Sequence, residues 1–265
     1  MVRIEEIVHI IPLGHEIDRA VKPFEHYKAN RVHLLAVTDT FEKYSRKMIE
    51  QQKHYLNVVK ERLTKLGIEV QIRNIDMFDF LEAVRHISNI AVAEKNRGNV
   101  VYVNISSAGR LTSAAATLAA MAHQLKPYYV SAERYSETKE EKDLHGLSIC
   151  EDPPKIQLLE TFPLQLPDED CIKVLVKLYK EKKGMTTTEI AEYLAEQKVE
   201  GFEKCSPWRR LPRDQRFNPL MKLNKRILQK LEKSGYITRE RKGRYNTIKI
   251  TPGGVAVAYI SGLVQ

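Results

Sequence analysis

The residues of this chain that are best suited to bind a ligand lie in one short segment, residues 104–113, with the sequence NISSAGRLTS. Small hydroxyl residues and a glycine precede an arginine at the expected start of an alanine-rich helix. Free backbone N–H groups and the helix dipole attract anions at such a helix start, and Arg110 can add a bidentate contact to a phosphate. We therefore predict an anion site formed by Ser106, Ser107, Ala108, Gly109 and Arg110. The alternative is an ordinary strand-to-helix turn in which Ser and Thr only cap the helix.

Several other kinds of site are not supported by the sequence. The segment matches neither GxGxxG nor GxxxxGK[ST], so we predict no NAD binding and no NTP hydrolysis. The three cysteines (Cys150, Cys171 and Cys205) are far apart and odd in number, and the 8 histidines form no HExxH pair. We therefore expect no disulfide framework, no structural metal and no tightly bound cofactor.

Alternating strand-like and helix-like segments have to position this turn. The expected strands are residues 4–11, 32–37, 68–75, 99–105 and 126–131, and the expected helices are residues 16–27, 40–66, 76–96 and 111–125. Pro23 is expected to bend or shorten the first helix, and Asp76 to cap the third. Repeated β-α units with short connections predict an α/β fold with a doubly wound, mostly parallel, Rossmann-like sheet.

Ligands bind such sheets at the carboxyl ends of the strands, near the point where the strand order reverses. This rule selects the loops at residues 12–15, 38–40, 106–110 and 131–134. It adds to the predicted ligand contacts Pro12, Leu13, Gly14, His15, Thr38, Asp39 and Arg134. Residues 132–147 are polar and charged, and we expect them to form a loop that is either flexible over the ligand edge or simply solvated.

All of the excess positive charge lies at the end of the chain. Residues 166–265 contain 21 Lys and Arg against 12 Asp and Glu, whereas the whole chain contains 43 against 34. The preceding residues are therefore neutral, and we predict two domains, residues 1–165 and 166–265. A basic module most often meets phosphates, because Lys and Arg release condensed counterions from a nucleic-acid backbone. A solubilising surface without a polyanionic partner is the alternative.

The basic module has the segment order of a winged helix-turn-helix. Amphipathic helices are expected at residues 168–183 and 219–234, a short capped helix lies between them, and two strands follow at residues 237–241 and 245–251. The third helix would enter the major groove, and the wing would contact phosphates or the minor groove. The predicted DNA contacts are Lys222, Lys225, Arg226, Arg239, Arg241, Lys242 and Arg244. A protein-interaction winged helix with a solvated basic face is the alternative.

An insertion at residues 198–218 separates the second and third helices by more than a simple turn. It carries a cluster of basic residues beside the single tryptophan, namely Arg209, Arg210, Arg213 and Arg216 beside Trp208. The insertion could extend the DNA contact or stack on a neighbour. Equally, Trp208 could anchor the loop onto the core.

The chain resembles a known family in the order of its parts. Residues 168–251 resemble winged-helix transcription regulators. A Rossmann-like domain with the turns IPLGH (residues 11–15) and SSAGR (residues 106–110), followed by a winged helix, resembles the CRISPR-associated Rossmann fold (CARF) regulators. The resemblance is to their archaeal winged-helix branch and to relatives outside CRISPR loci. It implies a homodimer with one two-fold pocket for a cyclic oligoadenylate, whose binding biases the orientation of the winged helices.

We therefore expect a ligand-responsive transcription regulator whose partners are double-stranded DNA and a nucleotide effector. One alternative is a metal-free ring nuclease, in which Ser106, Ser107 and Arg110, with His15 or Thr38 as further candidates, position the ligand's own 2′-hydroxyl. Another is a dimeric protein-interaction adaptor without a nucleic-acid contact. The sequence has no run of about 18 apolar residues, and acids interrupt its first apolar segment. We therefore expect a cytoplasmic protein without a membrane segment or signal peptide.

Overall fold

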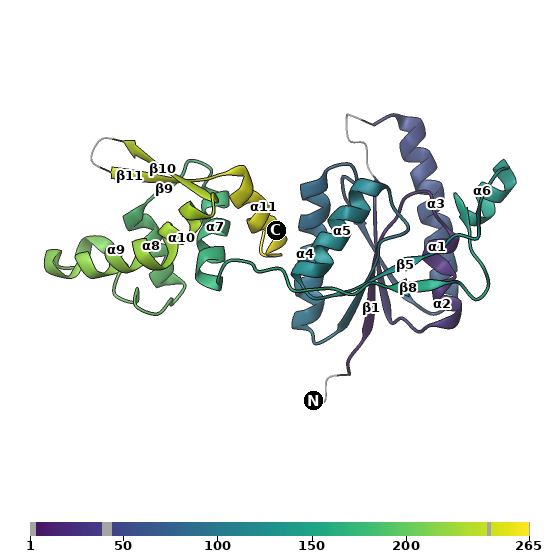
Figure 1. Ribbon diagram of the computed structural model, residues 1–265, viewed down its shortest axis with the longest axis horizontal. Coiled ribbons are helices and arrows are strands. Elements are labelled where there is room, and N and C mark those ends of the chain that lie inside the picture. The colour runs from purple at the N-terminus through teal and green to yellow at the C-terminus, as the bar shows by residue number, and fades with distance from the viewer. Residues whose placement is uncertain (1–3, 39–43, 243–244, 265) are drawn as a thin grey trace. The chain divides into compact units, whose positions relative to one another are not determined.

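The computed structural model describes residues 4–38, 44–242 and 245–264 (Figure 1). Two of the predicted contacts, Asp39 and Arg244, lie outside these described residues. The chain divides into two compact units, Met1–Leu164 and Gln165–Val264. No helix among the described residues combines the length and the apolar character needed to cross a lipid bilayer.

The first unit is built on a six-stranded sheet with the order β3-β2-β1-β4-β5-β8. Its strands are β1 (Ile7–Pro12), β2 (Arg31–Ala36), β3 (Glu69–Asn74), β4 (Val100–Asn104), β5 (Lys126–Val130) and β8 (Ile156–Leu158). The first five pair in parallel, and β8 runs antiparallel to β5 at the edge. The predicted doubly wound, mostly parallel sheet is thus confirmed, and its strand order reverses between β1 and β4.

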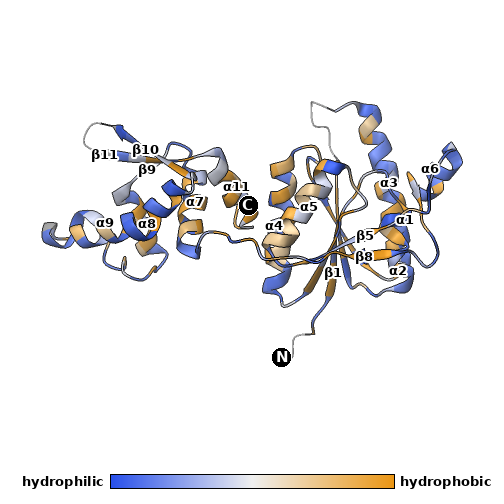
Figure 2. Cartoon of the chain, viewed as in Figure 1, coloured by the Kyte–Doolittle hydropathy of each residue, from blue (hydrophilic) through white to orange (hydrophobic). Residues whose placement is uncertain are grey.

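Helices cover both faces of this sheet (Figure 1). One layer contains α1 (Asp18–Val21), α2 (Pro23–His26) and α3 (Arg46–Lys65), and the other contains α4 (Phe80–Asn96) and α5 (Arg110–Ala122). The inner face of α5 is made of alanines, Ala115, Ala116, Ala119 and Ala120, all fully buried. Small side chains allow this helix to lie close to the sheet, and hydrophobic residues are concentrated along the central strands (Figure 2).

Two local expectations for this unit were wrong. Asp79, and not Asp76, caps α4, because its side chain accepts from Glu82 N at 3.1 Å while Asp76 accepts from Phe78 N at 3.0 Å. Residues 132–147 are not simply a loop. They contain β6 (Arg134–Tyr135) and α6 (Lys139–His145), and β7 (Ser148–Ile149) follows to pair with β6. A capping box between Thr138 and Glu141 begins α6, and this S/T-x-x-E spacing was visible in the sequence.

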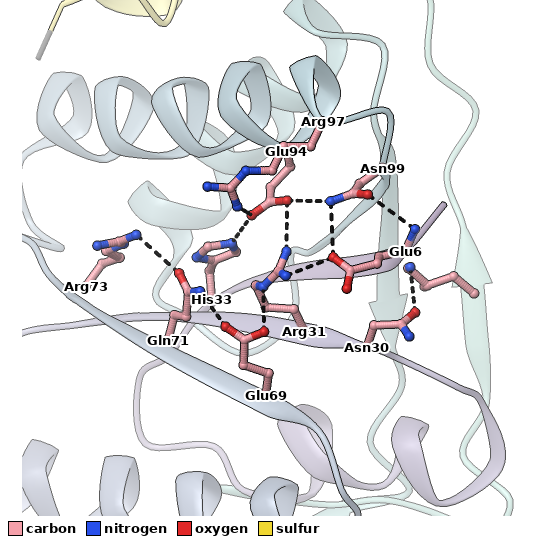
Figure 3. A network of polar contacts seen from close by, with 11 residues as sticks. Glu6, Asn30, Arg31, His33, Glu69, Gln71, Arg73, Glu94, Arg97 and Asn99 are labelled. Atoms are coloured by element: carbon pink, nitrogen blue, oxygen red, sulfur yellow. Dashed lines mark hydrogen bonds and ion pairs between the residues drawn. The ribbon is translucent and has the colours of Figure 1, made fainter. Parts of the chain in front are cut away.

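A network of charged side chains ties together the starts of the strands (Figure 3). Arg31, at the start of β2, forms ion pairs with the three carboxylates of Glu6, Glu69 and Glu94 at 2.8, 3.0 and 3.0 Å. His33 forms a hydrogen bond of 2.9 Å with Glu94. Burial opposes the charge on Glu94, but hydrogen bonds from Asn99 and His33, together with the charge of Arg31, hold the pKa of this carboxyl below its ordinary value. The network fixes the end of the sheet opposite to the carboxyl-end loops.

The second unit is a winged helix. Its helices are α7 (Glu169–Glu181), α8 (Thr187–Glu196), α9 (Phe217–Leu223), α10 (Gln229–Lys233) and α11 (Pro252–Ile260), and its strands are β9 (Met185–Thr186), β10 (Ile237–Lys242) and β11 (Tyr245–Ile250). A π-helical turn, Asn224–Leu228, joins α9 to α10. Residues 217–233 therefore form one continuous helix, called the recognition helix below, which begins two residues before the expected start.

The insertion at residues 198–218 is part of the core of this unit. Trp208 is 9% exposed and packs with the apolar stripe of the recognition helix, which includes Leu223, Ile227 and Leu231. Phe202 and Leu211 of the insertion join the same core. Of the interpretations that the sequence left open for Trp208, the structure supports the one in which it anchors the loop.

Candidate functional site

A cavity of about 410 Å³ lies at the carboxyl edge of the first unit's sheet, where the strand order reverses. The loops after β1, β2, β3 and β4 contribute to its wall. The lining residues are Leu13, Gly14, His15, Glu16, Val37, Met48, Gln52, Met77, Phe78, Ser107, Ala108, Gly109, Arg110, Leu111, Thr112 and Leu147. The two turns that the sequence singled out, residues 12–15 and 106–110, thus meet in one cavity.

Close backbone contact brings these two turns together. Gly14 N donates a hydrogen bond to Ser107 O at 2.7 Å. A β-carbon at Gly14 would lie 3.3 Å from that oxygen and 3.6 Å from Ala108 Cα, so the approach favours a glycine. From α3, Gln52 donates to Leu13 O at 2.8 Å and to Gly14 O at 3.3 Å. The first turn is therefore held from two sides.

The second turn presents three features that suit an anion. Gly109 is the N-cap of the 13-residue helix α5 and makes no side-chain cap hydrogen bond. Arg110, the first helical residue, is exposed at the cavity wall. Ser107 is fully buried, and its Oγ has no hydrogen-bond partner among the described residues. A helix start without a side-chain cap, a guanidinium and an unpartnered hydroxyl are the features that a phosphate or carboxylate ligand requires.

The other titratable groups in the cavity add little positive charge. His15 stacks on Tyr55 with ring centroids 4.8 Å apart, and burial lowers the pKa of its imidazole. This shift favours the neutral imidazole, which offers one N–H donor and one acceptor nitrogen. Burial also raises the pKa of Glu16, although hydrogen bonds from Ser148 oppose this shift. Among the described lining residues, Arg110 is the one permanent cation.

The rest of the wall is mostly apolar. Phe78 and Leu111 are 59% and 47% exposed where they line the cavity. Large apolar side chains that remain open to solvent at a cavity can pack against a planar ring. The cavity therefore has the Arg110 guanidinium at one end and an apolar surface beside it, a combination that suits a ligand carrying both a phosphate and an aromatic base.

Two predicted ligand contacts belong to the protein interior instead. Pro12 is the buried last residue of β1 and does not line the cavity. Ser106 Oγ donates to Asn104 Oδ1 at 2.7 Å and accepts from Val130 N at 3.1 Å. The hydroxyl of Ser106 thus connects β4 to β5.

Thr38 and Arg134 also lie outside the cavity wall. The backbone N–H of Thr38 donates to Asn74 Oδ1 at 2.8 Å. Arg134, on β6, forms an ion pair of 2.5 Å with Glu141 of α6. Of the candidates named for ring cleavage, the structure therefore brings Ser107, Arg110 and His15 to the cavity, and Ser106 and Thr38 do not line it.

Sequence reasoning missed several lining residues. Met77 and Phe78 follow β3, and the carboxyl-edge rule would have found them if it had been applied to that strand as well. Met48 and Gln52 lie one turn apart on the same face of α3. Leu147 reaches the wall because its N–H donates to His15 O at 2.8 Å. This contact joins segments far apart in the sequence, and no local pattern indicates it.

In the second unit, several predicted DNA contacts are already engaged within the protein. Arg226 forms an ion pair of 3.1 Å with Asp170 and donates to Glu200 O at 3.3 Å. Arg239 Nη1 donates to Asn224 Oδ1 at 2.6 Å, which connects the wing to the π-helical turn. Lys222 is half-buried, and its amine lies directly over Gly201 of the insertion.

Two other predicted contacts remain open to solvent. Lys225, on the recognition helix, and Arg241, on β10, are both exposed. Lys242 is the last residue of β10, and its side chain, like the whole of Arg244, is outside the described part of the structure. The exposed cations are thus shared between the recognition helix and the wing.

One group among the described residues has the geometry to hold a metal ion. Ligand atoms of Glu25, His26 and Asp152 lie within 4.8 Å of one another, and all three residues are exposed. His26 Nε2 lies 2.6 Å from Asp152 Oδ1. Exposed acidic groups are common without an ion, and none of the three lines the cavity.

Comparison with known proteins defines the class of each unit. Residues 7–135 match a family model described as HFX_2341_N:-like, N-terminal, and residues 170–262 match the DUF6293 C-terminal winged helix domain. The chain combines an HFX_2341_N-like domain with a DUF6293 winged helix domain. This order, a Rossmann-like domain followed by a winged helix, is the one expected from the sequence.

The chain is also similar to individual proteins. An uncharacterized protein of Archaeoglobus fulgidus is 28% identical over 213 residues, which cover 80% of this chain and 83% of that protein. Among solved structures, Enterococcus italicus Csm6 bound to cyclic hexa-2′-fluoro-hexa-dAMP is 12% identical, with a TM-score of 0.42, over 88% of this chain and 57% of Csm6.

Two further solved structures are similar to a comparable degree. Can2 from Sulfobacillus thermosulfidooxidans in complex with cyclic tetra-adenylate is 13% identical, with a TM-score of 0.39, over 96% of this chain and 61% of Can2. Protein VC1899 from Vibrio cholerae is 13% identical, with a TM-score of 0.38, over 97% of this chain and 66% of VC1899. The chain therefore spans less than two thirds of each of these solved chains.

Proposed function

We propose that this chain is a ligand-responsive transcription regulator. Its first unit binds a nucleotide in the carboxyl-edge cavity, and its winged helix binds double-stranded DNA. The proposal depends most on one observation: the uncapped start of α5, the Arg110 guanidinium and the unpartnered Ser107 hydroxyl share one cavity wall. A sensor site in a chain whose other unit is a basic winged helix supports regulation of DNA binding.

The proposed effector is a cyclic oligoadenylate. Its phosphodiester would bind at the start of α5, and its adenine would pack against Phe78 and Leu111. A cavity of 410 Å³ is in the lower part of the usual range for ligand pockets, about 300–1,000 Å³. A ring of several nucleotides therefore needs two such cavities, and we propose a homodimer that binds one ring across its two-fold axis.

Ligand and DNA affect each other through the populations of two conformations. The effector shifts the equilibrium only if it binds one arrangement of the dimer more tightly than the other. Coupling of this kind commonly changes the affinity of the second site by about 5–150-fold.

The test is fluorescence anisotropy with a labelled DNA duplex, at several salt concentrations, with and without cyclic tetra- and hexa-adenylate. We expect DNA affinity to fall with salt and to change at least fivefold with one of the rings, whereas AMP at the same concentration leaves it unchanged. DNA affinity that responds to neither ring would contradict the proposal. Chromatography of the recovered ring should show it intact, and a linear product would instead support a ring nuclease.

A further inference from the structure

Three basic side chains on the recognition helix and the wing already have acidic partners in their own unit. The ion pairs are Arg226 with Asp170, Lys230 with Asp168 and Arg239 with Glu232, at 3.1, 2.6 and 2.9 Å. A DNA phosphate that binds one of these cations has to compete with a carboxylate that is already in place. The surface predicted for DNA contact is therefore weaker electrostatically than its sequence suggests.

The insertion contains a short segment whose backbone is fixed from both sides. Trp208 begins a 3₁₀ turn, and its N–H donates to Glu192 of α8 at 2.6 Å. Arg216 places its guanidinium over the Trp208 ring, 5.9 Å from the centroid, and donates to Leu211 O at 2.8 Å and Arg209 O at 3.0 Å. Arg216 is therefore a structural arginine, and it holds the 3₁₀ turn in place.

Arg209 and Arg210 are the second and third residues of this turn, and both are exposed. Neither side chain has a hydrogen-bond or ion-pair partner among the residues that the structure describes. Two adjacent guanidinium groups on a fixed backbone lose less conformational freedom on binding than they would on a loose loop. Their planar donor groups match a phosphate in a bidentate manner.

The position of the turn relates these arginines to the DNA-binding motif. The turn packs against α8, and the following turn, Arg213–Gln215, packs against α9. In a helix-turn-helix, the N-terminal part of the recognition helix faces the groove. A side chain on the connection to that helix can therefore reach the phosphates that border the groove.

We propose that Arg209 and Arg210 form a phosphate clamp that extends the DNA interface beyond the recognition helix and the wing. This clamp rests on the proposed DNA-binding function. It contacts the backbone and not the bases, so it strengthens binding to every sequence equally. On the recognition helix, Arg226 and Lys230 are already paired with carboxylates. The insertion thereby supplies cations that have no such acidic partner.

The experiment measures the affinity of the full chain for two unrelated DNA duplexes as a function of KCl concentration. Each phosphate contact contributes about 0.9 to the slope of log K against log salt. We expect the double variant Arg209→Ala/Arg210→Ala to reduce this slope by about 1 to 2 and to weaken both duplexes by the same factor. The charge-reversed variant Arg209→Glu/Arg210→Glu should reduce both further, and Arg209→Lys/Arg210→Lys should keep most of the slope.

The matched control is Lys53→Ala/Lys60→Ala, which removes two exposed cations from α3 in the other unit. It should leave the slope unchanged. If the wild type binds DNA with a clear salt slope and Arg209→Ala/Arg210→Ala behaves like this control, the clamp is wrong and DNA binding stands. If the wild type shows no salt-dependent binding, the proposed function fails and the clamp fails with it. Unchanged thermal unfolding of each variant excludes misfolding as the cause.

Discussion

Ser107 and Arg110 contribute to the cavity in different ways. Ser107 is buried at the turn, where its Oγ has no partner among the described residues, and Arg110 is exposed at the start of α5. A buried hydroxyl without a hydrogen bond costs free energy that a ligand recovers when it binds. Arg110 supplies the charge, and Ser107 supplies a fixed hydrogen-bonding atom.

We expect Arg110→Ala to weaken binding of the nucleotide effector by about 10–100-fold, because a hydrogen bond to a charged group contributes roughly 1.5–3 kcal/mol. Basal DNA affinity should stay unchanged. The control is Arg134→Ala, which removes an exposed arginine that pairs with Glu141 outside the cavity. Calorimetric titration of both variants with the effector checks this. Wild-type affinity in Arg110→Ala would show that Arg110 does not bind the phosphate of the effector.

His9 is a buried histidine whose protonation affects the stability of the first unit. It lies between three aromatic rings, those of Phe24, Tyr102 and Tyr128, at centroid distances of 4.8, 4.9 and 5.4 Å. Burial lowers the pKa of His9 to about 3. The folded chain therefore keeps this imidazole neutral at a pH where the unfolded chain protonates it. The unfolding free energy is therefore unaffected by His9 above about pH 6.5, and it decreases as the pH falls from 6.5 toward 3.

We expect His9→Phe to flatten the pH dependence of the unfolding free energy between pH 7 and 5, by at most about 1.4 kcal/mol per pH unit. The single tryptophan lies in the second unit, so urea unfolding of the first unit should be followed by circular dichroism. His54→Gln, at an exposed position of α3, should keep the wild-type dependence. Parallel curves for His9→Phe and the wild type would show that His9 does not carry this effect.

At the scale of elements, the β-α alternation of the first unit could be predicted from sequence because its strands are short apolar or alternating runs bounded by turn residues. The break in the first helix was also predictable, because Pro23 has no N–H to donate within a helix and α2 begins at this residue after α1 has ended. The π-helical turn Asn224–Leu228 was not predictable. Its side-chain pattern fits a regular helix, and the contact from Arg239 to Asn224 is between distant segments.

The candidate site was predictable to the extent that it follows from topology. The turns at residues 12–15 and 106–110 were found because the carboxyl ends of parallel strands meet at one edge. Gln52 and Leu147 were missed because they reach the cavity through contacts across the fold. The place of Ser106 could not be predicted, because nothing in the sequence distinguishes a hydroxyl that faces a ligand from one that joins two strands.

One connecting element closes part of the cavity wall. Gly146 has a φ of +82°, and a β-carbon there would lie 2.5 Å from Ile17 N and 2.7 Å from His15 O. The backbone of residues 145–147 therefore packs directly on the loop after β1, and it places Leu147 in the wall. This close approach requires a glycine.

We expect Gly146→Ala to force these segments apart, to lower the unfolding free energy by about 2–3 kcal/mol and to weaken nucleotide binding at least tenfold. Gly98→Ala is the matched control, because Gly98 has a φ of +78° with no atom within 4 Å of a new β-carbon. It carries the backbone cost of about 1–2 kcal/mol without the collision. Thermal unfolding and calorimetry test both variants, and equal effects would mean that the contact at Gly146 is unimportant.

At the scale of the whole molecule, the two units differ in charge as well as in fold. The neutral first part is compatible with a sensor that binds one anionic ligand at a defined cation. The basic second part is compatible with a partner that presents a long row of phosphates. If the effector changes DNA affinity by some factor, DNA must change effector affinity by the same factor, because linkage is reciprocal.

The most direct test of the central claim is calorimetric titration of the full chain with cyclic oligoadenylates of different ring size, with AMP and linear diadenylate as controls. We predict tight binding of one ring size at one ring per two chains, and weak or no binding of the controls. Binding of no ring more tightly than AMP would contradict the account and would leave a winged-helix protein with a different effector.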